Sequence, residues 1–363
     1  MKNQQPIHPK GRAVLFSGPG KPFSISKYDL PESADEEIII KNLYTTICGS
    51  DIHTYCGHRS EPDQVVLGHE IVGEIFSLVP GKSHFDFSGK PVEIGDRVIW
   101  SIFAVPEGTK PPREDMPQKS EQLFKYGHAL ATSKDIFNGG LADYCVLRPN
   151  TAFLKISAAM PLQVAATISC AHATVTGAIR VAGEIANQRV IIFGAGLLGI
   201  SCAAMCREAG AARISLIDPD TSRLMWGEKF GADKTYTTED FYTDQSQPAE
   251  EGDIVFDMTG HPAAMKAGLD ALALGGTAVW IGAVFPAKHV EVDAQKIVRK
   301  LLQIKGLHNY NYDDFVNATS FIEHNYQKYP FQALIEKEYE LGEVEEAFRY
   351  ATQEKPVRVG IRI

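Results

Sequence analysis

The chain has 363 residues, more than one hydrophobic core ordinarily organises, so two domains are expected. Hydrophobic residues make up 44% of the chain and charged residues 22%, a balance that excludes a disordered or fibrous protein. The formal net charge of −9 argues against a nucleic-acid or anionic-membrane partner, because both recruit basic surfaces.

Targeting signals and disulfides are not predicted. The segment Met1–Lys10 is polar, and we find no apolar run of about 18 residues that would indicate a membrane span. Six cysteines in a chain of this length do not form a disulfide framework, so reduced thiols and a cytoplasmic location are expected.

The first part of the chain has short apolar runs broken by Gly and Pro, a pattern typical of β-structure. We predict strands at Ile38–Ile40, Val65–Leu67 and Ile71–Val79, and the segment Gly95–Trp100 is expected to be a turn that leads into another strand. The sequence therefore indicates an irregular, mostly β domain.

Two segments of this domain carry metal-binding chemistry. Cys48-Gly-Ser-Asp-Ile-His53 contains a thiol, a hydroxyl, a carboxylate and an imidazole, and Gly68-His69-Glu70 adds a second imidazole and a second carboxylate. A catalytic zinc site needs three protein ligands and one open position, and zinc binds Cys and His readily. Two ligands are visible here, and the third has to come from elsewhere in the chain.

Residues 103–139 differ from their surroundings. They are rich in proline and charge between Pro106 and Pro117 and lack periodicity, so an exposed loop is expected. No cysteine occurs between Cys56 and Cys145. Packing of Leu123, Phe124 and Tyr126 is expected to hold this lobe together.

A nucleotide-binding pattern follows. A buried strand at Gln188–Phe193 leads into the loop Gly194-Ala-Gly196-Leu197-Leu198-Gly199 and an Ala-rich helix, and Asp218 ends the next strand at about the expected distance. The glycines allow pyrophosphate to approach the amides of a helix N-terminus, and Asp218 suits the ribose hydroxyls. Because this carboxylate would repel a 2′-phosphate and the next cation is Arg223, NAD is preferred over NADP.

The alternation of strands and helices continues towards the C-terminus. Strands at Asp253–Asp257 and Ala278–Ile281 end where dinucleotides bind in such sheets, so further cofactor contacts are expected. The candidates are Thr259, Gly260 and Gly282, and Thr174 is a further one. Helices are predicted at 315–322 and 344–350, and a closing strand at 357–363.

These motifs resemble the zinc-dependent medium-chain alcohol dehydrogenases (the medium-chain dehydrogenase/reductase family) from about Arg12 to the C-terminus. The resemblance implies an α/β protein with a discontinuous, GroES-like, mostly β catalytic domain at 1–171 and 308–363 and a Rossmann coenzyme domain, a doubly wound parallel sheet, at 172–307. It also supplies the third metal ligand, so that zinc is bound by Cys48, His69 and Cys170.

The same resemblance assigns the remaining roles at the metal. Ser50 and His53 match the family's proton relay, Asp51 its carboxylate behind the ligand His, and Glu70 its acid beside zinc. The expected reaction is reversible hydride transfer between an alcohol and NAD, through a zinc-bound alkoxide and this relay. Many relatives bind a structural zinc with four cysteines in the lobe that is cysteine-free here, so one zinc per subunit is expected.

The substrate stays open at this point. Ile102 and Leu141 border the pocket by resemblance, and the pair His58-Arg59 suggests room for an anionic group. Lys-Tyr-Gly-His128 and Gly-Leu-His-Asn-Tyr310 are most similar to a branch proposed to act in phosphonate catabolism. A homodimer or homotetramer is also expected, with the strand 278–281 as the edge of a dimer.

Two alternatives remain beside this interpretation. One is a polyol or amino-alcohol dehydrogenase on the same scaffold, and the other is a non-catalytic NAD-binding redox module. The roles of His128 and His172 are undecided. The remaining cysteines are expected to be structural: Cys56, Cys145, Cys202 and Cys206.

Overall fold

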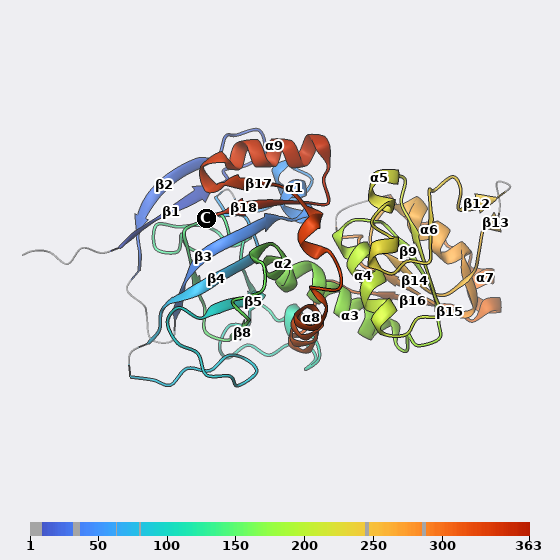
Figure 1. The fold of residues 1–363 in the computed structure, drawn as a ribbon, viewed down its shortest axis with the longest axis horizontal. Coiled ribbons are helices and arrows are strands. Elements are labelled where there is room, and N and C mark those ends of the chain that lie inside the picture. Colours follow the sequence, from blue (N-terminus) through green and yellow to red (C-terminus); the bar gives the residue numbers. More distant parts are fainter. Residues whose placement is uncertain (1–8, 32–36, 63, 80, 244–246, 285–287) are drawn as a thin grey trace, which may run out of the picture. The chain divides into compact units, whose positions relative to one another are not determined.

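The computed structural model describes residues 9–31, 37–62, 64–79, 81–243, 247–284 and 288–363, so most of Met1–Lys10 lies outside the described residues (Figure 1). The chain forms two compact units. Unit 1 contains residues 1–170 and 335–363, and unit 2 contains residues 171–334.

The sheet of unit 1 has the strand order β17-β18-β3-β4-β5-β6, with β7 paired to β3 and β8 paired to β5. Its strands are β3 (Ile38–Ile47), β4 (Glu70–Ser77), β5 (Arg97–Ala104), β6 (Phe124–Lys125), β7 (Tyr144–Leu147), β8 (Thr151–Lys155), β17 (Ile335–Glu340) and β18 (Arg358–Arg362). A separate hairpin pairs β1 (Lys10–Leu15) with β2 (Ser24–Asp29). Because β18 pairs with β3, the end of the chain lies beside the strand that leads into Cys48.

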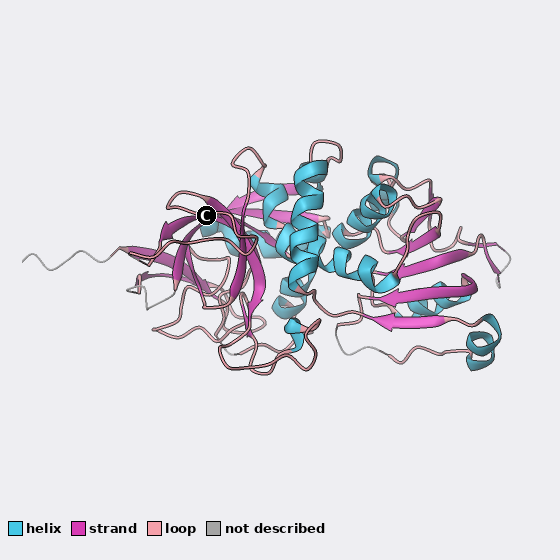
Figure 2. Cartoon of the chain, turned by 90° about the horizontal axis from the view of Figure 1, so that it is seen from below, coloured by secondary structure: helices cyan, strands magenta, loops and turns pink. Residues whose placement is uncertain are grey.

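Short helices complete unit 1: α1 (Gly49–Tyr55), η1 (Pro117–Lys119), α2 (Leu162–Ala166), η5 (Leu341–Glu343) and α9 (Val344–Glu354). Figure 2 shows that long loops connect many strands of this unit. In the lobe, Tyr126 is fully buried and Phe124 packs against the same hydrophobic cluster. Hydrophobic packing therefore contributes to this cysteine-free lobe through Phe124 and Tyr126, while the predicted role of Leu123 stays a prediction.

Most predicted strands of unit 1 are present, but the one at Val65–Leu67 is wrong. Val65 forms only isolated bridges, to Phe16 and Leu130, among the described residues. The run is apolar because it crosses the core, where all three side chains are fully buried. A short buried run of this kind does not by itself distinguish a strand from extended coil.

Unit 2 is a six-stranded parallel sheet in the order β11-β10-β9-β14-β15-β16. Its strands are β9 (Arg189–Phe193), β10 (Arg213–Ile217), β11 (Lys234–Tyr236), β14 (Gly252–Asp257), β15 (Leu272–Trp280) and β16 (Gln303–Gly306). The order reverses between β9 and β14, which is where doubly wound sheets bind dinucleotides. The predicted α/β class, with a mostly β part and a doubly wound parallel sheet, is confirmed.

The helices of unit 2 alternate with these strands (Figure 2). They are η2 (Ile168–His172, from the end of unit 1), α3 (Ala173–Ala182), α4 (Leu197–Glu208), α5 (Thr221–Leu224), η3 (Glu228–Phe230), α6 (Pro262–Asp270), α7 (Ala294–Lys300), α8 (Tyr312–Asn325) and η4 (Phe331–Leu334), and a small ribbon pairs β12 (Tyr242–Thr243) with β13 (Gln247–Pro248). The strand β9 is apolar on both faces because helices cover a parallel sheet on both sides.

Two differences from the sequence-based expectations concern unit 2. Residues 308–334, which the sequence assigns to the first domain, lie in unit 2, where α8 packs against α3 and Arg180 forms a bidentate ion pair with the buried Asp314. The strand at 278–281 is not an edge, since β15 pairs with both β14 and β16. The oligomeric state stays a prediction.

The helical run Leu162–Ala182 is long and apolar enough to cross a membrane by length and composition, contrary to the sequence-based expectation. Of its most apolar window, 67% is buried inside the structure. A buried helix in the core of a folded protein has the same property. Such a helix is apolar on all sides because neighbouring elements cover it.

Candidate metal centre and nucleotide loop

Three metal-binding side chains meet in unit 1. The ligand atoms of Cys48, His69 and Cys170 all lie within 4.8 Å of one another. Cys48 precedes the first turn of α1, His69 precedes β4, and Cys170 lies in the π-helical turn η2. Cys48 and His69 are buried, whereas Cys170 is partly exposed. The structure therefore brings together three residues that the sequence separates widely.

Asp51 holds two of these ligands in place. One carboxylate oxygen accepts the backbone N–H of Cys48 at 2.9 Å. The other accepts the N–H of Gly68 at 3.3 Å and lies 3.4 Å from Nδ1 of His69. Since Asp51 faces Nδ1, the Nε2 of His69 is the nitrogen left for a metal, and Ser50 Oγ lies 3.3 Å from it.

Glu70 lies behind the ligands and is fully buried. Arg358 donates to both of its oxygens, at 3.0 and 3.1 Å, and Thr46 donates a further hydrogen bond. The same guanidinium lies 3.7 Å from the sulfur of Cys48. Arg358 is a residue that the sequence analysis missed, because only the pairing of β18 with β3 brings it to this position.

These neighbours favour a thiolate at Cys48. The pKa of the Cys48 thiol is held well below its ordinary value, first by the hydrogen bond from the Cys170 thiol and then by the charges of Arg358 and His69. The hydrogen bond to Cys48 and burial raise the pKa of Cys170 in turn. The sulfur of Cys48 is therefore favoured as a thiolate, which is the form of cysteine that binds a metal cation.

The donor set fits zinc. Ligand atoms around one tetrahedral zinc ion lie about 3.5–4 Å apart, close to the spread found here, and two thiolates with one imidazole leave a fourth position open. The second nitrogen of His69 already faces a carboxylate, the usual arrangement of a zinc-bound histidine. We therefore find no conflict between this site and a catalytic zinc.

The predicted relay residues both lie on α1. Ser50 faces the metal site, and His53 follows one turn later and is half-buried. Burial lowers the pKa of His53, and the nearby charges of His58 and Arg59 lower it further. The ring of His58 is 5.7 Å from that of His53. His53 is consequently neutral near pH 7 and able to accept a proton.

The two undecided histidines differ. The ring of His128 is 4.9 Å from that of His69, and its Nδ1 lies 2.9 Å from Glu61. His172 is fully buried, with Nδ1 2.9 Å from Ser201 Oγ and its ring edge-on to Phe331. His128 belongs to the metal site's surroundings, and His172 belongs to the core of unit 2.

The glycines of the nucleotide loop have different tasks. Gly194 adopts φ +101°, which other residues rarely tolerate. A Cβ on Gly199 would lie 1.7 Å from the carbonyl oxygen of Gly194, whereas one on Gly196 would meet nothing within 4 Å. Gly194 and Gly199 shape the turn, and Gly196 leaves open space in front of α4, as a bound pyrophosphate requires.

Asp218 closes this loop. Its carboxylate accepts the N–H of Ala195 at 2.7 Å and that of Asp220 at 2.8 Å. The other predicted contacts lie on neighbouring helices: Leu197 and Leu198 begin α4, Arg223 lies on α5 at 3.8 Å from Asp220, and Thr174 lies half-buried on α3. Their contacts with a cofactor stay predictions.

Thr259, Gly260 and Gly282 meet at the ends of β14 and β15. A Cβ on Gly260 would lie 2.3 Å from the carbonyl oxygen of Gly282, so both glycines let the two backbones touch. The buried Asp257, which the sequence analysis missed, accepts from Thr259 Oγ1 at 2.6 Å and from the N–H of Gly260 at 2.9 Å. Both glycines are therefore required by the close approach of the two backbones, in addition to their predicted role in cofactor binding.

The cysteines predicted to be structural have no second donor cluster around them in the described part of the chain. Cys202 and Cys206 are fully buried in the core of unit 2, with sulfurs 3.9 Å apart, and Cys145 is buried in unit 1. Cys56 is exposed. Ile102 and Leu141 are buried, and their place at the substrate pocket stays a prediction.

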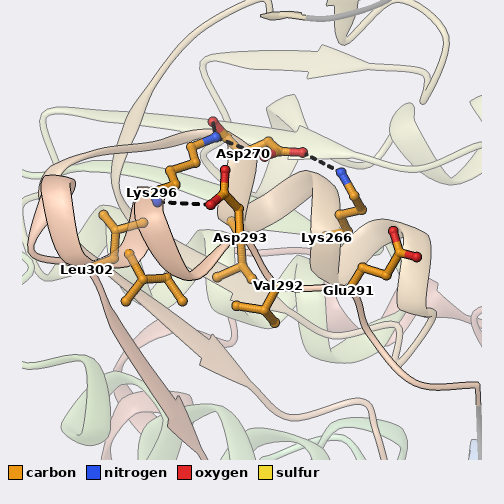
Figure 3. A pocket seen from close by; sticks show the side chains of 9 residues that line it. Lys266, Asp270, Glu291, Val292, Asp293, Lys296 and Leu302 are labelled. Atoms are coloured by element: carbon orange, nitrogen blue, oxygen red, sulfur yellow. Dashed lines mark hydrogen bonds and ion pairs between the residues drawn. The ribbon is translucent and has the colours of Figure 1, made fainter.

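A pocket of unit 2 lies beside α6 and α7 and contains none of the predicted site residues (Figure 3). Its charged side chains already pair with one another: Asp270 lies 3.2 Å from Nζ of Lys266 and 2.8 Å from Nζ of Lys296. We do not assign the active site to this pocket.

Two family models match the chain. Residues 34–158 match the alcohol dehydrogenase GroES-like domain, and residues 198–324 match the zinc-binding dehydrogenase domain. Among curated relatives, an L-threonine 3-dehydrogenase of Shewanella frigidimarina is 30% identical over 287 residues, which covers 77% of this chain and 78% of that protein.

Further relatives agree with these matches. A D-arabitol-phosphate dehydrogenase of Enterococcus avium is 28% identical over 347 residues, covering 92% of this chain and 91% of that protein. The crystal structure of an alcohol dehydrogenase from Thermotoga maritima superposes with a TM-score of 0.90 at 24% identity, covering 97% of this chain and 99% of that one. At this level of identity the structural likeness shows the shared fold.

Proposed function

Since the chain belongs to the zinc-dependent medium-chain alcohol dehydrogenases, oxidoreductases that act on CH–OH groups, we propose that it transfers hydride reversibly between a small alcohol and NAD. The observation that carries the proposal is the convergence of Cys48, His69 and Cys170, with Asp51 behind His69 and Ser50 in front of it. A non-catalytic redox module would not need these five groups together.

The chain's own residues supply the binding and the proton path. When bound, zinc supplies Lewis acidity to the substrate oxygen, and the nicotinamide of NAD accepts or returns the hydride. Ser50, whose hydroxyl is beside the ligand nitrogen of His69, accepts the proton of the alcohol while it releases its own hydroxyl proton towards His53. His53, one turn along α1, exchanges this proton with solvent.

The buried groups behind the ligands stabilise the protonation states of His69 and Cys48. Asp51 fixes the orientation and tautomer of His69 and raises its basicity. Glu70 is held by Arg358 and Thr46, so its role here is to anchor the guanidinium that stabilises the Cys48 thiolate. Approach of Glu70 to the metal would require these bonds to break.

The preferred cofactor is NAD, and one zinc ion is bound per chain. The carboxylate of Asp218 sits at the loop that shapes the phosphate site and would repel a 2′-phosphate. The lobe at 103–139 contains no cysteine, so a four-cysteine structural zinc cannot form there.

Substrate chemistry gives one alternative within the family. Relatives include enzymes named for L-threonine and D-arabitol phosphate, so a polyol or amino-alcohol substrate is compatible with the same machinery. A panel of alcohols, monitored through NADH absorbance, distinguishes these substrates.

Cys48→Ala tests the proposal, with Cys56→Ala as its matched control. We expect about one zinc per chain in the wild type, and we expect Cys48→Ala to lose zinc and at least roughly a thousandfold in turnover, because an open-site zinc supplies most of the activation of the alcohol. NADH should still bind. Cys56 is exposed at the end of α1, so its substitution should change neither zinc content nor rate.

Metal analysis and alcohol oxidation are the two measurements. Oxidation of alcohols by Cys48→Ala at the wild-type rate would end the catalytic-zinc proposal. Metal analysis close to two zinc ions per chain would contradict the single site.

A further inference from the structure

The turn from Lys125 to His128 is pressed against the metal ligand His69. Gly127 adopts φ +77°, and a Cβ there would lie 2.6 Å from the carbonyl oxygen of Gly68 and 3.1 Å from Cβ of His69. The rings of His69 and His128 lie 4.9 Å apart. Gly127 and His128 are therefore fixed beside the metal ligand His69.

A single carboxylate, that of Glu61, holds both Arg59 and His128. Oε1 of Glu61 lies 2.9 Å from Nδ1 of His128 and 2.7 Å from Nε of Arg59. The side chains of Glu61 and His128 are only 9% and 8% exposed, and that of Arg59 is 28% exposed. Glu61 thus fixes Arg59 next to the metal site, although its own charge is shared between two partners.

Lys125 adds a second cation with a rigid support. It lies on β6, opposite Phe103 of β5, between two anchored aromatic residues. Tyr126 is hydrogen-bonded to Thr151 at 2.6 Å, and Arg148 stacks over the ring of Phe124 at 4.9 Å. Since neighbouring side chains on a strand point to opposite faces, Lys125 points away from the face that buries these rings.

Lys125 lacks a carboxylate of its own. Among the described residues no acid lies within ion-pair distance of its ammonium, although the side chain is half-buried. Burial lowers the pKa of Lys125, the charges of Arg59 and Lys119 lower it further, and the charge of Glu61 opposes them with a smaller effect. Half-buried cations are normally paired, so this arrangement indicates a missing anion.

We propose that Lys125 and Arg59 bind an oxyanion group, such as phosphate, phosphonate or carboxylate, on the alcohol substrate. Glu61 is a positioning residue that holds Arg59 and His128. The inference rests on the proposed dehydrogenase function and specifies its substrate class: an alcohol that carries an anionic group. Arg59 shares the carboxylate of Glu61 with His128, and Lys125 has no acid within ion-pair distance among the described residues, so a bound anion balances the local charge.

Lys125→Met removes the charge and keeps the length of the side chain, and Lys125→Arg keeps the charge. Lys134→Met is the control, because Lys134 is an exposed lysine of the same lobe. The first measurement is calorimetric titration of the zinc-loaded protein with inorganic phosphate. We expect phosphate to bind to the wild type and to Lys134→Met, roughly tenfold more weakly to Lys125→Met, and within a few-fold of wild type to Lys125→Arg.

The second measurement is kcat/KM for glycerol, glycerol 3-phosphate and glycerate, which differ in one end group. We expect wild type to prefer an anionic member, and Lys125→Met to lose roughly tenfold to a hundredfold on that member and little on glycerol. The two anionic members distinguish a phosphate site from a carboxylate site.

Several outcomes would overturn the proposal. Phosphate binding that is unchanged in Lys125→Met, equal losses of kcat/KM on neutral and anionic alcohols, or a wild-type preference for glycerol each contradict it. A loss of NADH affinity in Lys125→Met would assign the cation to the cofactor instead. Lys125-dependent phosphate binding without turnover of any alcohol would refute the proposed function and leave the anion site standing.

Discussion

The metal centre of unit 1 and the nucleotide loop of unit 2 are built in opposite ways. The loop is a contiguous run from Gly194 to Gly199, and its chemistry comes from backbone amides and from the absence of side chains. The metal centre is built from the side chains of Cys48, His69 and Cys170, which three separate elements contribute. One site is local and depends on backbone, and the other is assembled by the fold.

This difference determines how each site tolerates substitution. At the loop, an added methyl group meets a steric conflict at Gly199 and open space at Gly196, only three positions earlier. At the metal centre, the supporting groups Asp51, Glu70 and Arg358 form a buried network in which each member has several partners. Loop variants should therefore act through shape, and metal-centre variants through charge and metal affinity.

The largest effect on the loop is expected from Gly199→Ala. Its Cβ would lie 1.7 Å from the carbonyl oxygen of Gly194, so the turn or α4 has to move, and we expect a loss of about 3 kcal/mol or more in the free energy of unfolding. Gly196→Ala is the matched variant. Its Cβ meets nothing within 4 Å, so stability should change by less than about 1 kcal/mol.

NADH binding separates the two glycines further. The methyl group of Gly196→Ala would occupy the space in front of α4, so affinity for NADH should fall roughly tenfold although the fold is intact. Chemical denaturation and fluorescence titration measure the two quantities. Equal stabilities of the two variants would contradict the view that the loop acts through shape.

A smaller effect is expected from removing the negative charge of Asp218, which is hydrogen-bonded to the loop. Asp218→Asn keeps the size of the side chain and removes its charge, so repulsion of a 2′-phosphate should disappear. We expect the ratio of NADPH to NADH affinity to rise roughly tenfold, with part of the change due to weaker NADH binding. Titration of the variant with each cofactor checks this, and equal losses for both would argue against a ribose contact.

The last effect, no larger than that at Asp218, is expected at His53, which lies one turn after Ser50 on α1. Its pKa lies below the ordinary value because of burial and the charges of His58 and Arg59, so the neutral, proton-accepting form is present above that lowered pKa and is lost as pH falls through it. His53→Gln lacks this base at every pH. We expect turnover to fall roughly tenfold near neutral pH and less at high pH, where solvent bases take over.

The pH profile of alcohol oxidation is the measurement for this variant. His58→Gln provides the control, because loss of a nearby positive charge should shift the acid limb of the profile slightly upward without removing it. An unchanged profile in His53→Gln would exclude His53 from the proton path.

The sequence predicted the loop site more completely than the metal centre. Gly194, Gly199 and Asp218 are close in the chain, and their pattern alone placed them between strand and helix, where the structure has them. Cys170 came only from resemblance to a family, since its spacing from Cys48 and His69 carries no signal. Val65–Leu67 was mistaken for a strand because burial of a short apolar run does not reveal its pairing.

The residues that sequence reasoning missed share one property. Arg358 reaches Glu70 and Cys48 because β18 pairs with β3, and the turn that follows Lys125 lies against His69 because Gly127 packs on Gly68. Glu61 was not singled out, although it connects Arg59 and His128. The composition of these segments resembles ordinary surface, and only their tertiary neighbours distinguish them.

The sequence by itself determined the two-part organisation, the nucleotide loop and the kinds of donor available for a metal. The tertiary structure decided which donors meet, where the second part ends at 334, and which charges surround the catalytic position. The physical reason is the range of the interactions. Backbone turns are set by neighbours in the chain, whereas a metal site and its charges depend on contacts between segments that only folding brings together.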